Sequence, residues 1–397
     1  MTALVAGAVW AGLIAWLLLR IFRQFRTHRA ASLGSPAAKT MDAPLPDVAI
    51  IVPARNEIAN IAACLEGLAG QSGLSGGSSI IVVDDASQDG TGQAVARAAR
   101  DDPRIEPIEA GDLPAGWMGK PYACWQGALH AQTEWLCFVD ADVRASPELV
   151  DTALTTATRQ RIDMLSLNPL QELGSFWERL IIPAGLVAIA CTTDLRPIDD
   201  PTSPEVSANG QFILIRRAVY FAVGGHAAVR GEVCEDKALA GRVKHGGWRY
   251  RMLGAEHLAR TRMYTGLAAL WEGLGKNAIE IIGDGPTTIA AATAATVVGW
   301  AAVLVPALTA IAVIQEPSAI GLIGVALAVL GSAAVLGIQI GTAGHFRVPL
   351  GFALLFPLAY SAVAALAWHS VARRRAGHIS WKGRTYALPR KASPGRP

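Results

Sequence analysis

The chain is organised around the stretch Phe138-Val139-Asp140-Ala141-Asp142-Val143, which follows Glu134-Trp135-Leu136-Cys137. The apolar, β-forming run from Trp135 to Val139 predicts a buried strand, and two carboxylates one residue apart stand at its end. Carboxylates are costly to bury without a partner, and Mg²⁺ or Mn²⁺ takes oxygen ligands while keeping positions open for phosphate oxygens. Two interpretations are open at this point: a cation site, or a surface turn in which aspartate is favoured.

The composition predicts membrane segments. Of the 397 residues, 52% are hydrophobic and only 17% are charged, whereas soluble domains carry about 25% charged residues. The mean hydropathy is +0.33 and the formal net charge is +3. The five cysteines are scattered without a Cys-X-X-Cys pair, which indicates neither a zinc site nor a disulfide framework. No interleaving of basic and aromatic residues suggests nucleic acid as a partner.

Apolar segments lie near both ends of the chain. Residues 3–19 are followed by arginines, which predicts an N-terminal transmembrane anchor (1–29) with its C-terminal side in the cytoplasm, before a linker (30–46) rich in Ala, Ser, Pro and Gly. Segments 289–314, 319–340 and 348–371 are each long enough to span a bilayer, so about three transmembrane helices are expected within 286–372. Three later spans would leave the basic tail (373–397) outside, against the positive-inside tendency. The number of crossings therefore stays open, and the apolar segment 176–191 is interpreted as a core helix or one on the membrane surface.

Between these segments, residues 47–285 alternate strand and helix patterns, which is typical of an α/β domain with a mostly parallel sheet. Strands are predicted at 48–52, 80–83, 105–108, 135–139 and 212–215, and helices at 58–68, 93–100, 120–130 and 237–244. Three of the strands end in polar loops that carry carboxylates, and ligands of open α/β sheets bind beyond the carboxyl ends of the strands. We therefore expect Asp84, Asp85, Asp140 and Asp142 to converge on one rim, as a site for a nucleotide and a metal ion.

Four ordered motifs resemble the family-2 glycosyltransferases of the GT-A fold, namely Val48–Glu57, Val83–Thr91, Asp140–Asp142 and Cys234–Asp236. The resemblance covers about residues 46–277. Further stretches are similar, more narrowly, to the membrane-bound, hopanoid-biosynthesis-associated (HpnB-type) glycosyltransferases and their carotenoid-modifying relatives: Gly116–Gly127, Asn209–Phe212, Trp271–Asn277 and Trp381–Arg384.

The resemblance implies a nucleotide-sugar-binding domain and a role for each matching residue on the donor side. The residues that would border the nucleotide base and ribose are Pro53, Arg55, Asn56 and Glu57. Asp85, or Asp84, would hydrogen-bond the base or the ribose.

The remaining matches concern the diphosphate, the metal and the acceptor. Lys120 would lie near the donor diphosphate, and Asp140 would contact the ribose or the sugar. Asp142, together with Asp140, would ligate Mg²⁺ or Mn²⁺. Asp236 would be the general base that takes the proton from the acceptor hydroxyl, because such a hydroxyl needs a carboxylate within hydrogen-bond reach.

Simpler interpretations of several residues stay open. Asp84 and Asp89 can cap a helix or stabilise their turn, and Asp236 can be the N-cap of the helix from Lys237, with Glu235 a bystander. Lys120 can be a solvated lysine at a helix start. His257 can be a metal ligand or an exposed histidine, and Arg260 or Arg262 can contact donor phosphate. Trp271 and Trp381 can be membrane anchors or platforms for a sugar.

The expected function is an inverting, metal-dependent transfer of one sugar from a nucleotide-sugar donor to a lipid, hopanoid-like acceptor at the cytoplasmic face of the inner membrane. Processive polymer synthases carry the motif Gln-X-X-Arg-Trp after their catalytic base, whereas this chain has Arg260–Tyr264 in the corresponding region. This difference argues for the transfer of a single sugar. The alternative is a polyprenyl-phosphate sugar synthase with the same donor chemistry. No Gly-X-Gly-X-X-Gly follows the first strand, which argues against a dinucleotide-binding oxidoreductase. The sequence does not specify the nucleotide base of the donor, the sugar or the acceptor.

Overall fold

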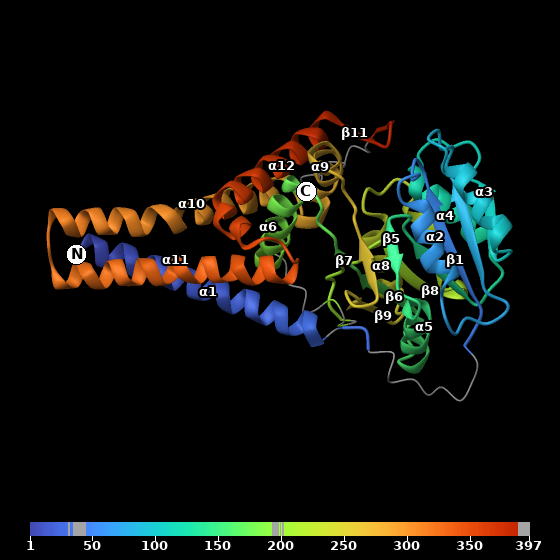
Figure 1. The fold of residues 1–397 in the computed structure, drawn as a ribbon, viewed down its shortest axis with the longest axis horizontal. Coiled ribbons are helices and arrows are strands. Elements are labelled where there is room, and N and C mark those ends of the chain that lie inside the picture. Colours follow the sequence, from blue (N-terminus) through green and yellow to red (C-terminus); the bar gives the residue numbers. More distant parts are fainter. Residues whose placement is uncertain (31, 35–44, 193–197, 199, 201, 388–397) are drawn as a thin grey trace, which may run out of the picture. The chain divides into compact units, whose positions relative to one another are not determined.

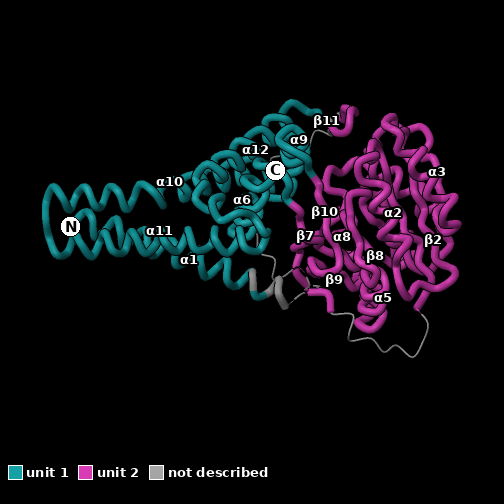
Figure 2. Tube along the Cα trace, in the orientation of Figure 1, with its two compact units in different colours: residues 1–27, 173–194, 264–379 teal, residues 28–172, 195–263, 380–397 magenta. Residues whose placement is uncertain are grey.

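The computed structural model describes residues 1–30, 32–34, 45–192, 198, 200 and 202–387, and the chain divides into two compact units (Figure 1, Figure 2). The helical unit comprises Met1–Thr27, Leu173–Asp194 and Tyr264–Ile379, and the α/β unit comprises His28–Glu172, Leu195–Met263 and Ser380–Pro397. Each unit is therefore assembled from segments far apart in the chain, and the segment from Ser380 belongs to the α/β unit. Residues 35–44 of the predicted linker and 388–397 of the predicted basic tail lie outside the described residues.

The α/β unit is built on a seven-stranded sheet with the order β3-β2-β1-β4-β8-β6-β9. Its strands are β1 (Val48–Ala54), β2 (Ser79–Asp84), β3 (Ile105–Glu109), β4 (Trp135–Val139), β6 (Met164–Asn168), β8 (Phe212–Arg216) and β9 (Tyr250–Gly254). Strand β1 is parallel to β2 and β4, and the pairs β2–β3 and β6–β9 are parallel too, whereas β8 is antiparallel to both of its neighbours. The mostly parallel sheet expected from the sequence is confirmed.

Helices cover both faces of this sheet, because successive side chains of each strand point to opposite faces. On one face Val48, Ile50 and Val52 of β1 share a core with α2 (Ile61–Ala69), α3 (Thr91–Asp101) and α5 (Leu149–Arg159). On the other, Ala49 and Ile51 share a core with α4 (Gly119–His130), α7 (Arg217–Ala222) and α8 (Glu235–His245). Strand β4 is buried along its whole length, which is why its sequence is a continuous apolar run.

A small second sheet in the α/β unit has the order β5-β10-β7, with β5 (Val143–Ala145), β7 (Leu170–Gln171) and β10 (Ala259–Thr261). Strand β5 begins one residue after Asp142, so this sheet supports the loop that carries both candidate metal ligands. The sequence does not predict these strands, because two or three residues are too few to establish an alternating pattern.

The helical unit contains α1 (Thr2–Ala30), α6 (Phe176–Thr192), α9 (Leu267–Ile282), α10 (Gly285–Gln315), α11 (Ala319–His345) and α12 (Phe356–Ala376). Four segments of the described chain are long and apolar enough to cross a membrane: Thr2–Gln24, Gly285–Gln315, Ala319–His345 and Leu350–Ala376. Large apolar side chains on them are exposed, for example Leu308 at 62%, Ile314 at 78% and Leu330 at 65%. These segments coincide with the predicted anchor and the predicted later spans, whereas α6, with 17 residues, is not among the four.

Two helices of this unit pack closely through glycines. A Cβ added at Gly7 of α1 or at Gly324 of α11 would overlap backbone of the other helix, and the indole N–H of Trp10 donates to Ser332 Oγ at 3.1 Å. Small residues that let backbones approach, together with a polar contact, are typical of helix pairs in membranes.

We predict that Gly324→Leu destabilises the helical unit, because the added side chain cannot fit against the Ala3 carbonyl of α1. Overpacking of this kind costs about 1–3 kcal/mol. Gly337→Leu on the same helix is the matched control, since nothing lies within 4 Å of a Cβ built there. Thermal unfolding in detergent should show a lower midpoint for Gly324→Leu alone, and equal midpoints for both variants would contradict the packing described here.

Candidate functional site

Three loops meet at the carboxyl ends of β1, β2 and β4, which are neighbouring parallel strands. Ala54 pairs with Asp84 in register, and the Asp85 N–H donates to the Ala54 carbonyl at 2.8 Å. The predicted convergence of carboxylates on one rim is therefore confirmed for the loops that begin at Ala54, Asp84 and Asp140. This rim is the candidate site.

The loops after β1 and β2 are tied together by hydrogen bonds. Asn56 has a positive φ of 52° and its Oδ1 accepts the Gln88 N–H at 2.9 Å. The Arg55 guanidinium donates to the carbonyls of Asp85 and Ala86. Pro53, another of the predicted residues, is the last but one residue of β1. These contacts fix the backbone on which the predicted base and ribose contacts stand.

Two of the aspartates stabilise backbone of the loops after β1 and β2. Asp84 Oδ1 accepts the Ser87 N–H at 3.0 Å. Asp89 accepts the N–H groups of Ile58 and Thr91, each at 3.0 Å. The turn-stabilising interpretation of both residues therefore fits the structure. Of the pair Asp84–Asp85 it is Asp85 that is buried at this rim, with 3% of the residue exposed.

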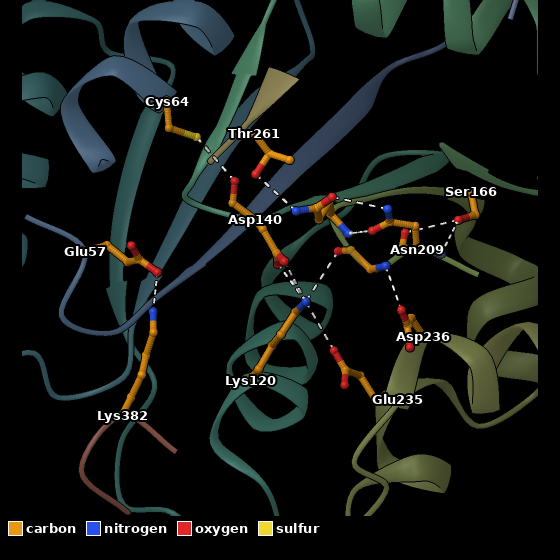
Figure 3. A network of polar contacts seen from close by, with 12 residues as sticks. Glu57, Cys64, Lys120, Asp140, Ser166, Asn209, Glu235, Asp236, Thr261 and Lys382 are labelled. Atoms are coloured by element: carbon orange, nitrogen blue, oxygen red, sulfur yellow. Dashed lines mark hydrogen bonds and ion pairs between the residues drawn. The ribbon is translucent and has the colours of Figure 1, made fainter. Parts of the chain in front are cut away.

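Lys120, the second residue of α4, lies between carboxylates (Figure 3). Its Nζ donates to Asp140 at 2.7 Å and lies 3.2 Å from Glu235 Oε1, and it also approaches the Gly210 carbonyl at 3.4 Å. Burial opposes the ammonium charge, but Asp140 and Glu235 outweigh it and hold the pKa of Lys120 well above its ordinary value. The solvated-lysine interpretation is therefore wrong, and Glu235, interpreted as a bystander beside Asp236, forms an ion pair with Lys120.

Asp236 is the second residue of α8, whose N-cap is Cys234, so the N-cap interpretation of Asp236 is wrong. Its Oδ2 accepts the Gly210 N–H at 2.8 Å and its Oδ1 accepts the Lys237 N–H at 2.8 Å. Burial, followed by the charge of the neighbouring Glu235, raises the pKa of Asp236 to about 6. A carboxylate of that basicity is a better proton acceptor at neutral pH than an ordinary aspartate.

Asn209, the residue before Gly210, takes part in a polar network with Ser166 (Figure 3). Asn209 accepts from Gln211 N–H and donates to Asn168, while Ser166 both donates to and accepts from the Asn209 backbone. The Gln211 carbonyl accepts the Asp140 N–H at 3.1 Å, and the Gln211 side chain donates to Thr261 of β10. The motif Asn209–Gln211 therefore connects the loop of Asp140 to the carboxylate of Asp236.

Asp142 is the least satisfied carboxylate of the site. Its Oδ1 is buried and has no hydrogen-bond partner among the described residues. Burial, then the nearby charges of Asp140 and Glu57, raises the pKa of Asp142 to about 7. Burial likewise raises the pKa of Asp140, although Lys120 opposes the shift.

The carboxylate pair fits a divalent cation in its chemistry. Oxygen donors suit Mg²⁺ and Mn²⁺, and an orphaned, buried carboxylate oxygen on Asp142 is the kind of atom that such an ion would satisfy. No group of three or more His, Cys, Asp or Glu side chains in the described part of the chain is arranged to hold a metal ion. Donor phosphate oxygens are ligands of the kind that such an ion takes in addition to carboxylates.

The weaker candidates do not join this cluster. His257 is exposed, and Arg260 on β10 lies 3.7 Å from Glu172. Arg262 is exposed as well. Trp271 on α9 of the helical unit lies against His369, with ring centroids 5.7 Å apart. By contrast, Lys382 and Arg384, to which the sequence assigned no role of their own, contact Glu57 and Asp85.

The comparisons with known proteins show similarity to glycosyltransferases. Residues 49–181 match the family model described as Glycosyl transferase family 2. The chain is similar to 4,4'-diaponeurosporenoate glycosyltransferase of Staphylococcus aureus (strain bovine RF122 / ET3-1), with 30% identity over 204 residues, 51% of this chain and 52% of the relative. The protein of that name from strain N315 is 31% identical over 192 residues, 48% of this chain and 49% of the relative. The chain thus matches about half the length of these curated relatives.

Among solved structures, the mannosyltransferase PcManGT from Pyrobaculum calidifontis, in complex with GDP-Man and Mn²⁺, aligns with a TM-score of 0.51 at 17% identity. The alignment covers 94% of this chain and 99% of that chain. At this identity the likeness concerns the fold alone. The chain therefore has the GT-A fold, with a mostly parallel central sheet and several long apolar helices, and the predicted fold class is confirmed.

Proposed function

We propose that this protein transfers one sugar from a nucleotide-sugar donor to a lipid acceptor at a membrane. One observation carries the proposal: the Asp236 carboxylate and the Lys120–Asp140–Glu235 network meet at Gly210, beside the loops after β1, β2 and β4. The family 2 match supports a nucleotide-sugar donor. The name of the S. aureus relatives supports a lipid-like acceptor, for which we propose a hopanoid-like molecule.

The proposed reaction is a direct displacement. The acceptor hydroxyl gives its proton to Asp236 as its oxygen bonds to the anomeric carbon of the sugar. The bond from that carbon to the donor phosphate oxygen breaks, and its electron pair leaves with the nucleoside diphosphate. One base and one displacement invert the configuration at the anomeric carbon. Lys120, held by two carboxylates, supplies positive charge on the side of the leaving diphosphate.

Asp142, with Asp140, would hold Mg²⁺ or Mn²⁺ at this site. When bound, the ion would neutralise charge on the diphosphate. The residues of the chain keep separate tasks: Lys120 orients Asp140, and the turn at Gly210 holds the Asp236 carboxylate toward the acceptor side.

The helical unit supports a lipid acceptor and a membrane location. Its four long apolar segments expose large apolar side chains, and exposed apolar surface of that kind marks contact with a membrane or a partner. We propose a multi-pass protein of the inner membrane with its α/β unit in the cytoplasm, where nucleotide sugars occur. A lipid acceptor would then reach the enzyme from the bilayer.

The test of the donor class is calorimetric titration of the detergent-purified, full-length chain with UDP and with GDP, each with and without Mn²⁺. One of the two nucleotides should bind, and only in the presence of the metal. Transfer is then followed with the corresponding radiolabelled nucleotide sugars and membrane lipid extracts. If neither nucleotide binds under either condition, the proposal fails.

We predict that Glu235→Gln shifts the acid limb of the pH profile of kcat/KM to lower pH. The unprotonated Asp236 is the active form, so activity should fall as the pH drops through its pKa of about 6. The Glu235 charge helps to raise that pKa, and removing it favours ionisation of Asp236. Glu232→Gln, at an exposed position in the same segment, should leave the limb in place. An upward shift or no shift in Glu235→Gln would contradict the assignment of the base.

A further inference from the structure

The hairpin that follows α12 in the chain lies against the candidate donor site. It consists of β11 (His378–Trp381) and β12 (Arg384–Ala387), joined by Lys382 and Gly383, which have positive φ angles of 45° and 77°. Two successive positive φ values give the tight hairpin turn whose twist matches the flanking strands. Residues 381–386 belong to the α/β unit, so their contacts with the rim lie within one compact unit.

Lys382 and Arg55 bind each other reciprocally. The Lys382 ammonium donates to the Arg55 carbonyl at 3.1 Å, and Arg55 Nε donates to the Lys382 carbonyl at 3.3 Å. The same ammonium forms an ion pair with Glu57 Oε1 (Figure 3). Glu57 Oε2 accepts from the Asn60 side chain at 3.0 Å, so both oxygens of this half-buried carboxylate are fixed.

Arg384 makes the second ion pair, with Asp85 Oδ2. The Asp85 side chain is only 4% exposed, and its Oδ1 is buried without a hydrogen-bond partner among the described residues. A buried acceptor left without a hydrogen bond is energetically unfavourable. The carboxylate is thus neutralised and oriented through one oxygen while the other lacks a donor, as expected of a group that accepts a hydrogen bond from a ligand.

The hairpin also reaches the start of α4. The Gly119 N–H donates to the Tyr386 hydroxyl at 3.4 Å. A Cβ at Gly119 would lie 2.5 Å from Asp85 Oδ2 and 2.8 Å from Arg384 Nη1, so the ends of these two side chains pack directly against the start of α4. The hairpin therefore contacts the loops after β1 and β2 and the turn before Lys120.

We propose that the C-terminal hairpin, Trp381–Tyr386, is a structural wall of the donor-binding site. In it Arg384 is a positioning residue that presents Asp85 Oδ1 to the nucleoside part of the donor. Lys382 positions the Glu57 carboxylate in the same way. This inference rests on the proposed function, because it assigns the wall of that same donor site. The competing possibility is a latch that blocks the site and must be released before the donor binds, and it predicts the opposite sign in the test.

The experiment is calorimetric titration of the full-length protein with UDP and GDP, each with Mn²⁺, and with inorganic pyrophosphate and Mn²⁺. The variants are Arg384→Gln, Arg384→Lys and, as a matched control, Arg375→Gln, which removes the same charge at an exposed position of α12. For the nucleotide that wild type binds, Arg384→Gln should weaken binding about tenfold or more, because it removes a charge-assisted hydrogen bond. Arg384→Lys should restore part of the loss, and Arg375→Gln should have no effect.

Pyrophosphate separates positioning of the nucleoside from a general loss of structure. Its binding should be the same in Arg384→Gln and wild type, because the proposed role of Asp85 concerns the nucleoside. Tighter nucleotide binding in Arg384→Gln would establish a latch and overturn the wall. Unchanged nucleotide binding, or an equal loss for nucleotide and pyrophosphate, would overturn it as well. If wild type binds neither nucleotide, the proposed function itself fails, and this inference with it.

Discussion

Asp236→Asn is expected to lower kcat by about 10²- to 10⁴-fold, the range that a positioned general base contributes, while binding of the donor nucleotide stays as in wild type. The amide has nearly the same shape as the carboxylate but cannot accept the acceptor proton at neutral pH. It can still accept the Gly210 N–H through its oxygen, the contact that holds the side chain in place at 2.8 Å in wild type. The change therefore isolates the proton transfer from the geometry of the turn.

Two measurements check this prediction. Initial rates of sugar transfer report kcat, and calorimetric titration with the nucleotide and Mn²⁺ reports the donor site separately. Glu232→Gln is the matched control, because it removes a carboxylate at an exposed position four residues earlier in the chain. Asp236→Asn protein that binds nucleotide normally and still transfers sugar at the wild-type rate would rule Asp236 out as the base.

The sequence predicts best those helices and strands whose hydrophobic pattern lies within a few consecutive residues. The strand predicted at Trp135–Val139 is β4 with the same bounds, because five consecutive buried residues give an uninterrupted apolar run. The helix predicted from Lys120 to His130 is α4, which begins one residue earlier at Gly119. By contrast, β6 and β9 were not predicted, although they pair with each other in the main sheet. Neither of these two strands is followed by a loop with a motif such as Asp140-Ala141-Asp142 that would mark its end.

The sequence predicts those residues of the candidate site that directly follow a strand. It does not predict contacts between residues that are far apart in the chain. Asp84, Asp85, Asp140 and Asp142 follow β2 and β4, so the register of parallel strands brings them together. The ion pair between Lys120 and Glu235 is not predicted, because the two residues are more than a hundred positions apart in the chain. Lys382 lies 325 positions from Glu57, and no periodicity connects residues at such a distance. The motif Trp381–Arg384 was visible, but its contact with the donor loops was not.

The Lys120 network shows why composition alone cannot assign such residues. A lysine at a helix start is usually solvated, and only the combination of Asp140, Glu235 and the Gly210 carbonyl around Nζ makes it part of a site. Those three partners come from the loop after β4, from α8 and from the turn before β8. Their convergence follows from the sheet order, in which β4 and β8 are neighbours.

Asp142→Asn is expected to weaken Mn²⁺-dependent nucleotide binding by at least about 100-fold, since even residues that only support a metal ligand cost 10- to 100-fold in metal affinity when changed. The amide keeps the size of the side chain but loses the negative charge that would attract the cation. Calorimetric titration with the nucleotide, with and without Mn²⁺, measures this directly, whether or not the acceptor is known. Asp101→Asn, at the exposed end of α3, is the control and should bind as wild type does.

The same substitution should leave the metal-free protein as stable as wild type, or more stable, at pH 8. In the folded chain the pKa of Asp142 is raised to about 7 by burial and by the charges of Asp140 and Glu57. An acid whose pKa is higher in the folded than in the unfolded state loses stability as the pH rises through the folded value, because ionisation then favours unfolding. The amide side chain of the variant cannot ionise and escapes this loss. Thermal unfolding without metal should therefore show an equal or higher midpoint for Asp142→Asn, and a clearly lower midpoint would mean that Asp142 is a structural residue and not a ligand held ready for a cation.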